Sequence, residues 1–522
     1  MAKEAILRNA MRLIPGLCAA LAIAAPMASY AKSPDRQAVI VSFKQAVNAN
    51  DRAAIARLDG RVKLELREVN ALAVDMPRKA LAQLKQNKRI KFVEDDTIQH
   101  VMGTASQSVA PASGGTQVTP YGIPMVQADQ LPDSRAQNRT LCIIDSGYEA
   151  AHEDLAGNRV SGENLTTSGD WNTDESHHGT HVGGTVSGID NTLGVIGVMP
   201  NAHVKLYIVK VFDESGSAPS SRIAQGMLRC MSNRANVVSM SLGGSAPSQM
   251  QQQVVTLMAQ RNILLIAAAG NGGNSAVSYP AGFSEVVSVA AIDANKNWAT
   301  FSQFNPDVEL AGPGVSVLSS VPMGTGMAAS VTAGGTGFEV IAMDGSPLAS
   351  VTRPLADFGL GDTVIPGGMT NKVCLIQRGN ISFSDKVLNC QASGGAGAVI
   401  YNNVPGPLLG TLGGIATTIP SVGADGNDGA ALLAKVGAST TVSVSVSNYA
   451  LFDGTSMATP HVSAVAALVW SYFPTCTAAQ MRTSLARGAE DLGDAGRDVK
   501  FGFGLVQART TFSRINQLGC GN

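Results

Sequence analysis

The sequence predicts an α/β protein: a parallel β-sheet with helices on both faces, a small α+β unit before it and a mostly β insertion within it. Three observations predict this fold class. From Tyr121 onward, short apolar runs alternate with helical stretches. Residues 36–99 mix strand and helix patterns, and residues 325–448 are rich in Gly, Val, Thr and Ser. A chain of 522 residues is long enough for two or three such domains.

Residues 1–31 have the order of a secretory signal peptide. Lys3, Arg8 and Arg12 precede an apolar stretch from 13 to 25, and small residues flank Tyr30. The stretch is shorter than the roughly 20 residues that span a bilayer, so its removal is favoured over its retention as a membrane anchor. We therefore expect a secreted, extracellular protein.

Cysteine usage agrees with export. Removal of residues 1–31 removes Cys18 and leaves six cysteines, an even number that suggests three disulfides. Six cysteines allow about 15 pairings. Proximity in sequence favours Cys374–Cys390 and Cys476–Cys520, which leaves Cys142–Cys230. The net charge of −1 gives no reason to expect nucleic acid or an anionic membrane surface as a partner.

Residues 36–99 are expected to form the small α+β unit. The patterns indicate strands at 38–41, 62–66 and 91–94 and a helix at 77–86. Residues 100–116 follow as a linker, which from Gly103 to Thr116 is rich in Ser, Gly, Ala and Gln. Such linkers are exposed and easily cut.

Residues 117–324 and 449–522 carry the pattern of the parallel sheet. Buried strands are expected at 141–144, 237–240, 263–267 and 286–290, and helices at 178–187, 222–233 and 457–471. Apolar runs separated by helices are typical of a parallel sheet covered on both faces. In residues 325–448 one expected helix, 385–393, interrupts turns and β-rich sequence. The active site of such a sheet gathers at the carboxyl ends of the strands.

Three polar residues stand where a predicted strand ends or a helix begins. Asp145 follows the run 141–144, His178 opens a helix of small residues, and Ser456 opens the helix that contains Pro460. Because proline is tolerated best in a first helical turn, Pro460 supports a helix start at the serine. There the helix dipole favours negative charge at or beside the hydroxyl.

A serine hydroxyl is a weak nucleophile until a neighbouring base takes its proton, and a carboxylate must hold that base in the right tautomer. Ser456, His178 and Asp145 can supply these roles. Each residue alone has a structural interpretation: the aspartate as a turn or cap, the histidine as a structural side chain and the serine as an N-cap. All three in these contexts together favour catalysis.

The surrounding strings resemble those of the subtilisin-like (S8) serine peptidases. They are Ile143–Gly147, His177–Thr185 and Gly454–Val462. The resemblance covers roughly residues 117–324 and 449–515. It implies that these two stretches form the first and second parts of a peptidase domain, the second running to residue 522.

The resemblance also implies a role for each residue. Asp145 orients the imidazole, His178 is general base and acid, and Ser456 attacks the carbonyl carbon of a peptide bond. His181 is then a neighbour on the helix, and His461 is a structural residue.

The resemblance extends to the substrate cleft. Ala267–Asn271 resembles the strand and loop that line the primary specificity pocket, so Asn271 is implied to donate its amide to the oxyanion; a turn residue is the alternative. Ser241–Gly244 resembles the edge that pairs with extended substrate. The implied substrate-binding residues are Ser241, Leu242, Gly243, Gly244, Ala268, Ala269 and Gly270. Because these strings are rich in Ala, Gly and Ser, we expect a broad or apolar preference.

The loop 189–195 resembles the family's high-affinity calcium loop. Calcium takes several oxygen ligands. The implied ligands are side-chain oxygens of Gln117, Asp154 and Asn191 and carbonyl oxygens of Ile189, Leu193 and Val195. A solvated turn is the alternative, and no organic cofactor is implied.

Two further parts resemble known companions of this peptidase domain. Residues 36–99 resemble the inhibitory propeptide, which assists folding and occupies the active site until it is cleaved, here within Gly103–Gln117. Residues 325–448 resemble a protease-associated (PA) domain, through Val373–Gly379, Phe383–Lys386 and Gly397–Asn403. Such domains are not catalytic and guide substrates to the cleft or restrict their access.

The sequence thus predicts a secreted serine endopeptidase, made as a zymogen and acting on proteins and peptides as a monomer. A pseudoenzyme that binds peptides or partners through the PA domain is the alternative from another class. The intact triad and Asn271 argue against it, because a binding module needs none of these residues together. A proprotein convertase of the kexin kind needs a strongly acidic cleft, which the Ala/Gly/Ser-rich strings do not supply.

Overall fold

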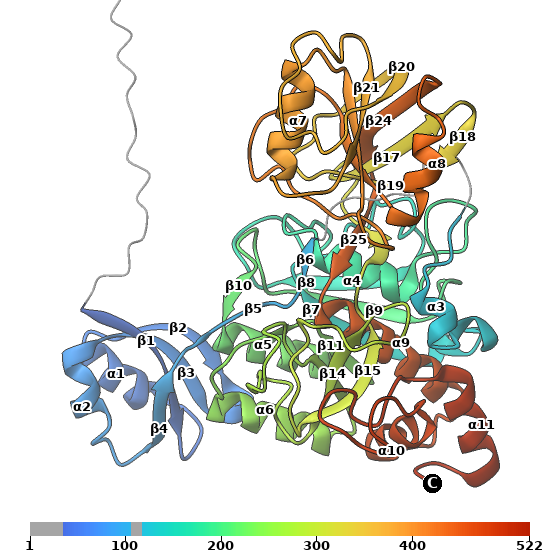
Figure 1. Ribbon diagram of the computed structural model, residues 1–522. Coiled ribbons are helices and arrows are strands. Elements are labelled where there is room, and N and C mark those ends of the chain that lie inside the picture. Colours follow the sequence, from blue (N-terminus) through green and yellow to red (C-terminus); the bar gives the residue numbers. More distant parts are fainter. Residues whose placement is uncertain (1–34, 106–116) are drawn as a thin grey trace, which may run out of the picture.

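The computed structural model describes residues 35–105 and 117–522 (Figure 1). The expected signal peptide, residues 1–31, lies outside these ranges, as do residues 106–116 of the expected linker. Among the helices of the described ranges, none combines the length and the apolar character that crossing a membrane requires.

A seven-stranded sheet forms the centre of the molecule, and all its strands run parallel. In spatial order the strands are β15 (Val308–Pro313), β14 (Val286–Ile292), β13 (Leu264–Ala268), β11 (Val237–Met240), β7 (Thr140–Asp145), β9 (Lys205–Lys210) and β8 (Arg159–Asn164). All residues of β11, β13, β14 and β15 are buried. Burial on both faces explains the continuous apolar runs in the sequence, and the predicted parallel sheet is confirmed.

Strand β7 contributes to two separate cores, because successive side chains of a strand point to opposite faces. Leu141 and Ile143 belong to one core and Cys142 and Ile144 to the other. The first core includes residues of α4 (His178–Ser187), α9 (Thr455–Tyr472), α10 (Ala478–Gly488) and α11 (Ala508–Leu518), and the second includes α5 (Ser220–Ser232) and α6 (Gln249–Gln260). Helices therefore cover both faces of the sheet (Figure 1).

The N-terminal domain, residues 35–96, is an antiparallel sheet with two helices. Its strands lie in the order β2 (Arg61–Leu66), β3 (Ala71–Pro77), β1 (Arg36–Phe43) and β4 (Ile90–Asp95), with helices α1 (Ala49–Arg57) and α2 (Leu81–Leu84). Val39 and Val41 pack with Ile55 of α1 and Leu84 of α2, whereas Ile40 joins the core that contains α5 and α6. One face of the sheet thus carries its own helices, and the other lies against the central domain.

The helix expected at 77–86 is shorter in the structure. A 3₁₀ turn, Arg78–Ala80, precedes α2, and the helix ends at Leu84. The chain turns at Asn87, whose side-chain oxygen accepts a hydrogen bond from the Arg89 amide at 3.0 Å. The chain then enters β4 at Ile90.

The insertion, residues 326–447, forms an eight-stranded mixed sheet that projects from the central domain in Figure 1. Its strands lie in the order β18 (Thr336–Phe338), β17 (Gly326–Ala333), β24 (Ser439–Ser447), β20 (Ala349–Asp357), β21 (Val373–Gln377), β22 (Gly397–Tyr401), β23 (Ser421–Ala424) and β19 (Val340–Ala342), with helices α7 (Phe383–Ala392) and α8 (Gly429–Leu433). The chain enters through β16 (Val317–Ser320) and returns through β25 (Tyr449–Asp453), which pair antiparallel. The insertion therefore delivers the chain directly to α9 and Ser456.

The three expected disulfides are present and confirm the pairing suggested by proximity. Cys142–Cys230 joins β7 to α5, and Cys374–Cys390 joins β21 to α7 inside the insertion. Cys476–Cys520 ties the residues before α10 to the end of the chain after α11.

Candidate active site

Asp145 and His178 meet in the structure as a hydrogen-bonded pair. Asp145 is the last residue of β7 and His178 the first of α4, so the carboxyl end of a strand faces the start of a helix. His178 Nδ1 lies 2.7 Å from Asp145 Oδ1, and both side chains are buried. Within the described residues, His178 Nε2 has no hydrogen-bond partner. The pair therefore leaves that nitrogen available for another group.

Asp174, which the sequence reasoning missed, positions the start of α4. Its Oδ2 accepts hydrogen bonds from the Thr180 amide and hydroxyl, both at 2.7 Å. Its Oδ1 accepts from Ser146 Oγ at 2.8 Å, and Ser146 in turn contacts Asp145 Oδ1 through its amide at 2.8 Å. The sequence did contain a signal for this role: an acidic residue stands shortly before the predicted helix, whose first amides need hydrogen-bond acceptors.

Ser456 lies in the first turn of α9 and is completely buried. Its Oγ donates to the carbonyl oxygen of Ser241 at 2.8 Å, and Ser241 Oγ donates to the carbonyl oxygen of Ser456 at 2.8 Å. Pro460 lies beyond the first turn, contrary to the sequence expectation, and has no amide hydrogen to offer the carbonyl four residues before it. The Ser241 hydroxyl satisfies that carbonyl instead.

A carbonyl oxygen of the chain itself, that of Met102, lies between two donors at this site. Asn271 Nδ2 donates to it at 2.7 Å and the Ser456 amide at 3.1 Å. Asn271 Oδ1 accepts from the amide and hydroxyl of Thr455, at 2.9 and 2.8 Å, which orients Nδ2 toward Met102. A Cβ at Gly454 would lie 2.5 Å from the Met102 oxygen, so glycine is needed for this approach.

Residues 97–105, here called the cleft segment, run through the site as extended chain. Strand β5 (Ile98–Val101) lies between β10 (Ser217–Pro219) and β12 (Leu242–Gly243) and is antiparallel to both. The Met102 amide donates to the Ser241 carbonyl at 3.1 Å, and β6 (Thr104–Ala105) pairs with β25 beyond it. The expected linker residues 100–105 are therefore strand and strand-flanking chain, because partners far along the sequence supply their hydrogen bonds.

The bond between Met102 and Gly103 lies beside the catalytic candidates. A Cβ at Gly103 would lie 2.9 Å from His178 Nε2 and 3.1 Å from Met457 Sδ. The carbonyl oxygen of Met102 thus lies at Asn271, and Gly103, on the other side of the bond, lies at His178.

The expected substrate-binding residues occupy two edges of the cleft. Ser241, Leu242, Gly243 and Gly244 run beside the cleft segment, and Gly244 also pairs with Tyr279. A Cβ at Gly243 would lie 3.0 Å from Met102 Cε, so the Met102 side chain passes over this glycine. Ala268 ends β13, and Ala269 and Gly270 follow it just before Asn271; the Gly270 amide donates to Thr455 Oγ1 at 3.2 Å.

Two carboxylates of the N-terminal domain cap helices of the central domain. Glu94 accepts from Ser248 Oγ at 2.7 Å and from the Gln249 and Met250 amides at 2.8 and 3.0 Å, at the start of α6. Asp96 accepts from the Ser221 amide at 2.9 Å and its hydroxyl at 2.7 Å, at the start of α5. Carboxylates are stabilised at helix N-termini by the unpaired amides and the dipole.

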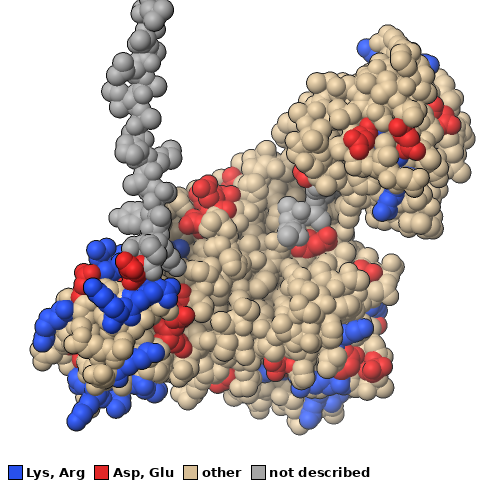
Figure 2. Space-filling model, turned by 60° about the vertical axis from the view of Figure 1, so that its left-hand side comes forward, with Lys and Arg blue, Asp and Glu red and all other residues tan. Residues whose placement is uncertain are grey.

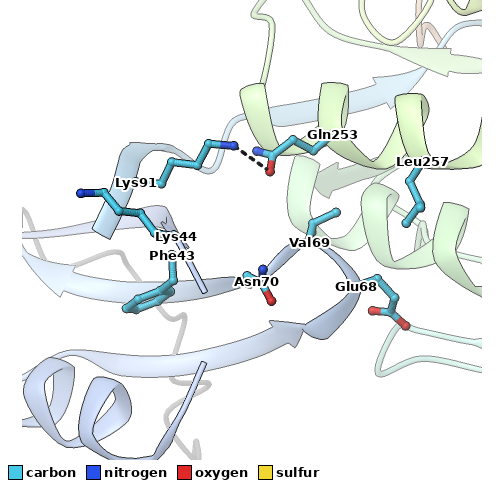
Figure 3. A pocket seen from close by; sticks show the side chains of 8 residues that line it. All are labelled: Phe43, Lys44, Glu68, Val69, Asn70, Lys91, Gln253 and Leu257. Carbon is cyan, nitrogen blue, oxygen red and sulfur yellow. Dashed lines mark hydrogen bonds between the residues drawn. The ribbon is translucent and has the colours of Figure 1, made fainter. Parts of the chain in front are cut away.

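The interface also contains buried apolar contacts and one pocket. Figure 2 shows lysines and arginines gathered on the N-terminal domain, beside a face of the central domain on which charged residues are sparser. A pocket remains between that domain and α6, and Lys91 Nζ reaches across it to Gln253 Oε1 at 3.4 Å (Figure 3). This pocket lies away from Ser456 and belongs to the interface.

Two further histidines near the site are buried and neutral. His181 Nε2 contacts the carbonyl oxygens of Val317 and Ala450, at 2.9 and 3.2 Å. Burial lowers the pKa of His181 to about 3 and that of His461 to about 4. Both rings contact backbone carbonyl oxygens, His461 through Nδ1 to that of Met457 at 2.8 Å.

The expected calcium ligands converge in the structure. Gln117 Nε2 donates to the Ile189 carbonyl at 2.7 Å, and Asn191 Nδ2 donates to Asp154 Oδ1 at 3.1 Å. Asp154 Oδ2 accepts from the Val195 amide at 2.7 Å, and the Leu193 amide donates to Asn191 Oδ1 at 2.9 Å. Burial raises the pKa of Asp154. Among the described residues, no group of three or more His, Cys, Asp or Glu side chains could hold a metal, so this loop offers mainly neutral oxygens.

Known proteins match both the sequence and this architecture. The model of the subtilase family matches residues 136–340 and 413–504, and that of the PA domain matches 341–432. Subtilisin amylosacchariticus of Bacillus subtilis subsp. amylosacchariticus is 35% identical over 306 residues, which are 56% of this chain and 76% of that protein. Subtilisin DY of Bacillus licheniformis is 42% identical over 215 residues, 40% of this chain and 77% of that protein.

Solved structures agree. The psychrophilic subtilisin-like protease Apa1 from the Antarctic psychrotroph Pseudoalteromonas sp. AS-11 has a TM-score of 0.67 and 41% identity, covering 78% of this chain and 100% of its own. Fervidolysin from Fervidobacterium pennivorans, at a TM-score of 0.59 and 19% identity over 92% of this chain and 61% of its own, shares the fold. The chain therefore belongs to the subtilase family of serine endopeptidases, with a PA domain inserted in its peptidase domain.

Proposed function

We propose that this protein is a secreted endopeptidase made as a zymogen, and that its first substrate is its own Met102–Gly103 bond. One observation carries the proposal: the Met102 carbonyl oxygen accepts hydrogen bonds from Asn271 Nδ2 at 2.7 Å and from the Ser456 amide at 3.1 Å. Two donors on one carbonyl oxygen are the arrangement that stabilises the oxyanion of acyl transfer.

Catalysis follows from the pair of buried side chains beside that carbonyl. Ser456 Oγ turns from the Ser241 carbonyl toward His178 Nε2, gives up its proton there and bonds to the carbonyl carbon. Asp145 holds the imidazole through Nδ1 and stabilises its charged form. His178 then passes the proton to the nitrogen of Gly103, which leaves, and a water activated by the same imidazole releases the acyl group as a carboxylate.

The N-terminal domain acts as an intramolecular inhibitor. Its cleft segment adds a strand between β10 and β12, which is how extended peptides bind a sheet edge. After cleavage, the contacts of Glu94 and Asp96 with α6 and α5 remain. The cut product therefore stays in the cleft until it dissociates or is degraded.

Protein substrates bind in the same register once the cleft is free. The Met102 side chain beside Gly243 supports an apolar or broad preference at the residue before the cleaved bond. The signal-like segment 1–31 and the three disulfides support secretion. We expect the mature enzyme to be a monomer that acts outside the cell, with the PA domain affecting which proteins reach the cleft.

A calcium ion at the loop 189–195 supplies structural stability in this proposal. The donors fit: the side-chain amides of Gln117 and Asn191 already approach Ile189 and Asp154, and each amide carries an oxygen as well as its NH2 group. Turning both amides would direct oxygens inward, with the carbonyls of Leu193 and Val195 completing an oxygen set of the kind calcium prefers.

Removal of calcium tests that site separately from catalysis. A chelator is expected to lower the melting temperature of the mature enzyme, and added calcium to restore it, because an ion that binds only the folded state stabilises it. The Asp154→Asn variant should respond much less to either treatment. Equal melting temperatures with and without chelator would remove the calcium proposal.

The catalytic proposal is tested with the full chain and its Ser456→Ala variant. The unmodified chain should shorten to a mature form and digest casein, and a serine-directed inhibitor should stop digestion. The variant should keep its full length after export, apart from the signal peptide, and leave casein intact. Identical shortening of both chains, with no effect of the inhibitor, would contradict the catalytic role of Ser456.

A further inference from the structure

Gln99 of the cleft segment and Gln251 of α6 form a buried pair of amides. Both residues are 0% exposed. Gln99 Nε2 donates to Gln251 Oε1 at 2.9 Å, and Gln251 Nε2 donates to Gln99 Oε1 at 3.0 Å. Buried polar groups are costly unless they are hydrogen-bonded, so each amide requires the other.

Each glutamine NH2 group has a second hydrogen, and its acceptor shows which of the two side chains the peptidase domain holds in place. Gln251 Nε2 also donates to the Ser220 carbonyl at 3.1 Å, and Gln99 Nε2 to the Tyr279 carbonyl at 3.2 Å. Ser220 begins α5, so the peptidase domain itself fixes the orientation of the Gln251 amide. When the cleft segment leaves, Gln251 continues to present one acceptor and one donor to the cleft.

The register of the cleft segment decides which substrate residue meets Gln251. Gln99 is three residues before Met102, whose carbonyl lies between Asn271 and Ser456. Strands β10 and β12 hold the intervening backbone on both sides. A Cβ at Gly244 would lie 3.1 Å from Gln99 Cγ, so that glycine leaves room for a long side chain.

We propose that Gln251 is a specificity residue and that the mature enzyme selects substrates with glutamine four residues before the cleaved bond. This inference rests on the proposed function, since it concerns the same cleft. An apolar side chain at that position would leave Oε1 and one N–H of Gln251 unpaired in a buried site. A glutamate would oppose Oε1 with a second acceptor and would bury a charge.

Quenched fluorogenic peptides test the preference with the enzyme matured from the full chain. The parent peptide carries the sequence of residues 97–105, and three further peptides replace its glutamine with methionine, leucine or glutamate. Loss of two hydrogen bonds in a buried subsite predicts kcat/KM about 10- to 30-fold lower for methionine and leucine than for glutamine. Glutamate should be cut more slowly still.

Two variants, each with one glutamine of α6 replaced by methionine, show whether Gln251 causes the preference for glutamine. In Gln251→Met the methionine and leucine peptides should be cut at least as fast as the glutamine peptide. Gln253→Met changes the same residue type two positions along α6, where the side chain contacts Lys91 of the N-terminal domain. This control should keep the glutamine preference of the unmodified enzyme.

The outcomes separate this inference from the proposed function. If the unmodified enzyme cuts all four peptides equally, at the Met-Gly bond, the amide preference is wrong while the peptidase function stands. If it cuts none and Ser456→Ala behaves identically, the proposed function fails. Should Gln251→Met not fold, as judged by its melting curve, the peptide series with the unmodified enzyme alone decides.

Discussion

Asn271 uses both atoms of its amide for separate purposes. Oδ1 accepts two hydrogen bonds from Thr455, the residue before Ser456, and Nδ2 faces the Met102 carbonyl. The proposed oxyanion donor is therefore held by the helix that carries the proposed nucleophile. A shift of α9 would move both together and preserve their relation.

The donor role of Asn271 predicts a specific kinetic effect. Asn271→Leu keeps the approximate shape of the side chain and removes the donor. We expect kcat on a peptide substrate to fall about 10²–10³-fold with little change in KM, because the lost hydrogen bond strengthens only as negative charge develops. A raised KM with unchanged kcat would show that Asn271 binds the ground state instead.

The two buried histidines predict how stability depends on pH. The pKa is about 3 for His181 and about 4 for His461, below the value of about 6.5 for an exposed histidine. Below about pH 6.5 the unfolded chain binds protons that the folded chain excludes, so the free energy of unfolding falls as pH falls. Each histidine contributes a slope of up to about 1.4 kcal/mol per pH unit, down to its folded pKa.

Denaturant titrations of the Ser456→Ala chain between about pH 7 and 5 measure this slope without self-digestion. Adding His461→Gln removes one titrating group, and the slope should decrease accordingly. The same slope with and without His461 would contradict a neutral, buried histidine at this position.

At the scale of elements, the N-terminal domain is held by contacts with two helix starts together with an apolar face, to which Ile40, Leu66 and Val69 contribute. Glu94 caps α6 and Asp96 caps α5, and both residues lie just before strand β5, which leads into the cleft. These contacts set the direction of the cleft segment. They also lie outside the bond to be cut, so they persist after cleavage.

The double variant Glu94→Gln and Asp96→Asn tests this docking. A charge-assisted cap stabilises by about 1 kcal/mol or more, so loss of two should weaken the inhibitory complex about tenfold or more. Cleavage, followed by mass spectrometry, should then lead to casein activity after a shorter lag. Asp95→Asn is the matched control, because the Asp95 carboxylate accepts from Gln37 within the N-terminal domain. Equal lags in all chains would contradict the docking role.

The elements that the sequence predicted best are those defined by their own burial. The runs in β7, β11, β13 and β14 are apolar because both faces of the sheet are covered, and the helix predicted at 178–187 has those bounds in the structure. The cleft segment could not be predicted in this way. Its partners in β10, β12 and β25 lie far along the chain and bind its backbone, so no side-chain periodicity is required.

In the candidate site too, residues in patterned elements could be predicted, and residues defined by distant contacts could not. Asp145, His178 and Ser456 stand at the ends of well-patterned elements, and their strings could be recognised. Gln251 and Asp174 could not, because their contacts join residues of separate elements and neither lies in a distinctive string. Pro460 can lie one turn inside α9 because the hydroxyl of Ser241, between β11 and β12, bonds the carbonyl that the proline leaves without an amide donor.

At the scale of the whole molecule, a segment of the chain itself occupies the candidate active site. The N-terminal domain lies on α5 and α6, the cleft segment crosses the carboxyl ends of the central strands, and the insertion rises from the chain that leads to Ser456 (Figure 1). The arrangement explains how one polypeptide can fold with its cleft occupied. Under the proposed function, the activating cut falls at one bond, Met102–Gly103.

The N-terminus of the mature enzyme tests this account most directly. Intact mass and N-terminal sequencing should be performed within the first minutes of processing, before any trimming of the new end. The account predicts a chain that begins at Gly103, a released fragment that ends at Met102, and neither product from Ser456→Ala. A first cut at another bond, or the same cut in Ser456→Ala, would contradict it.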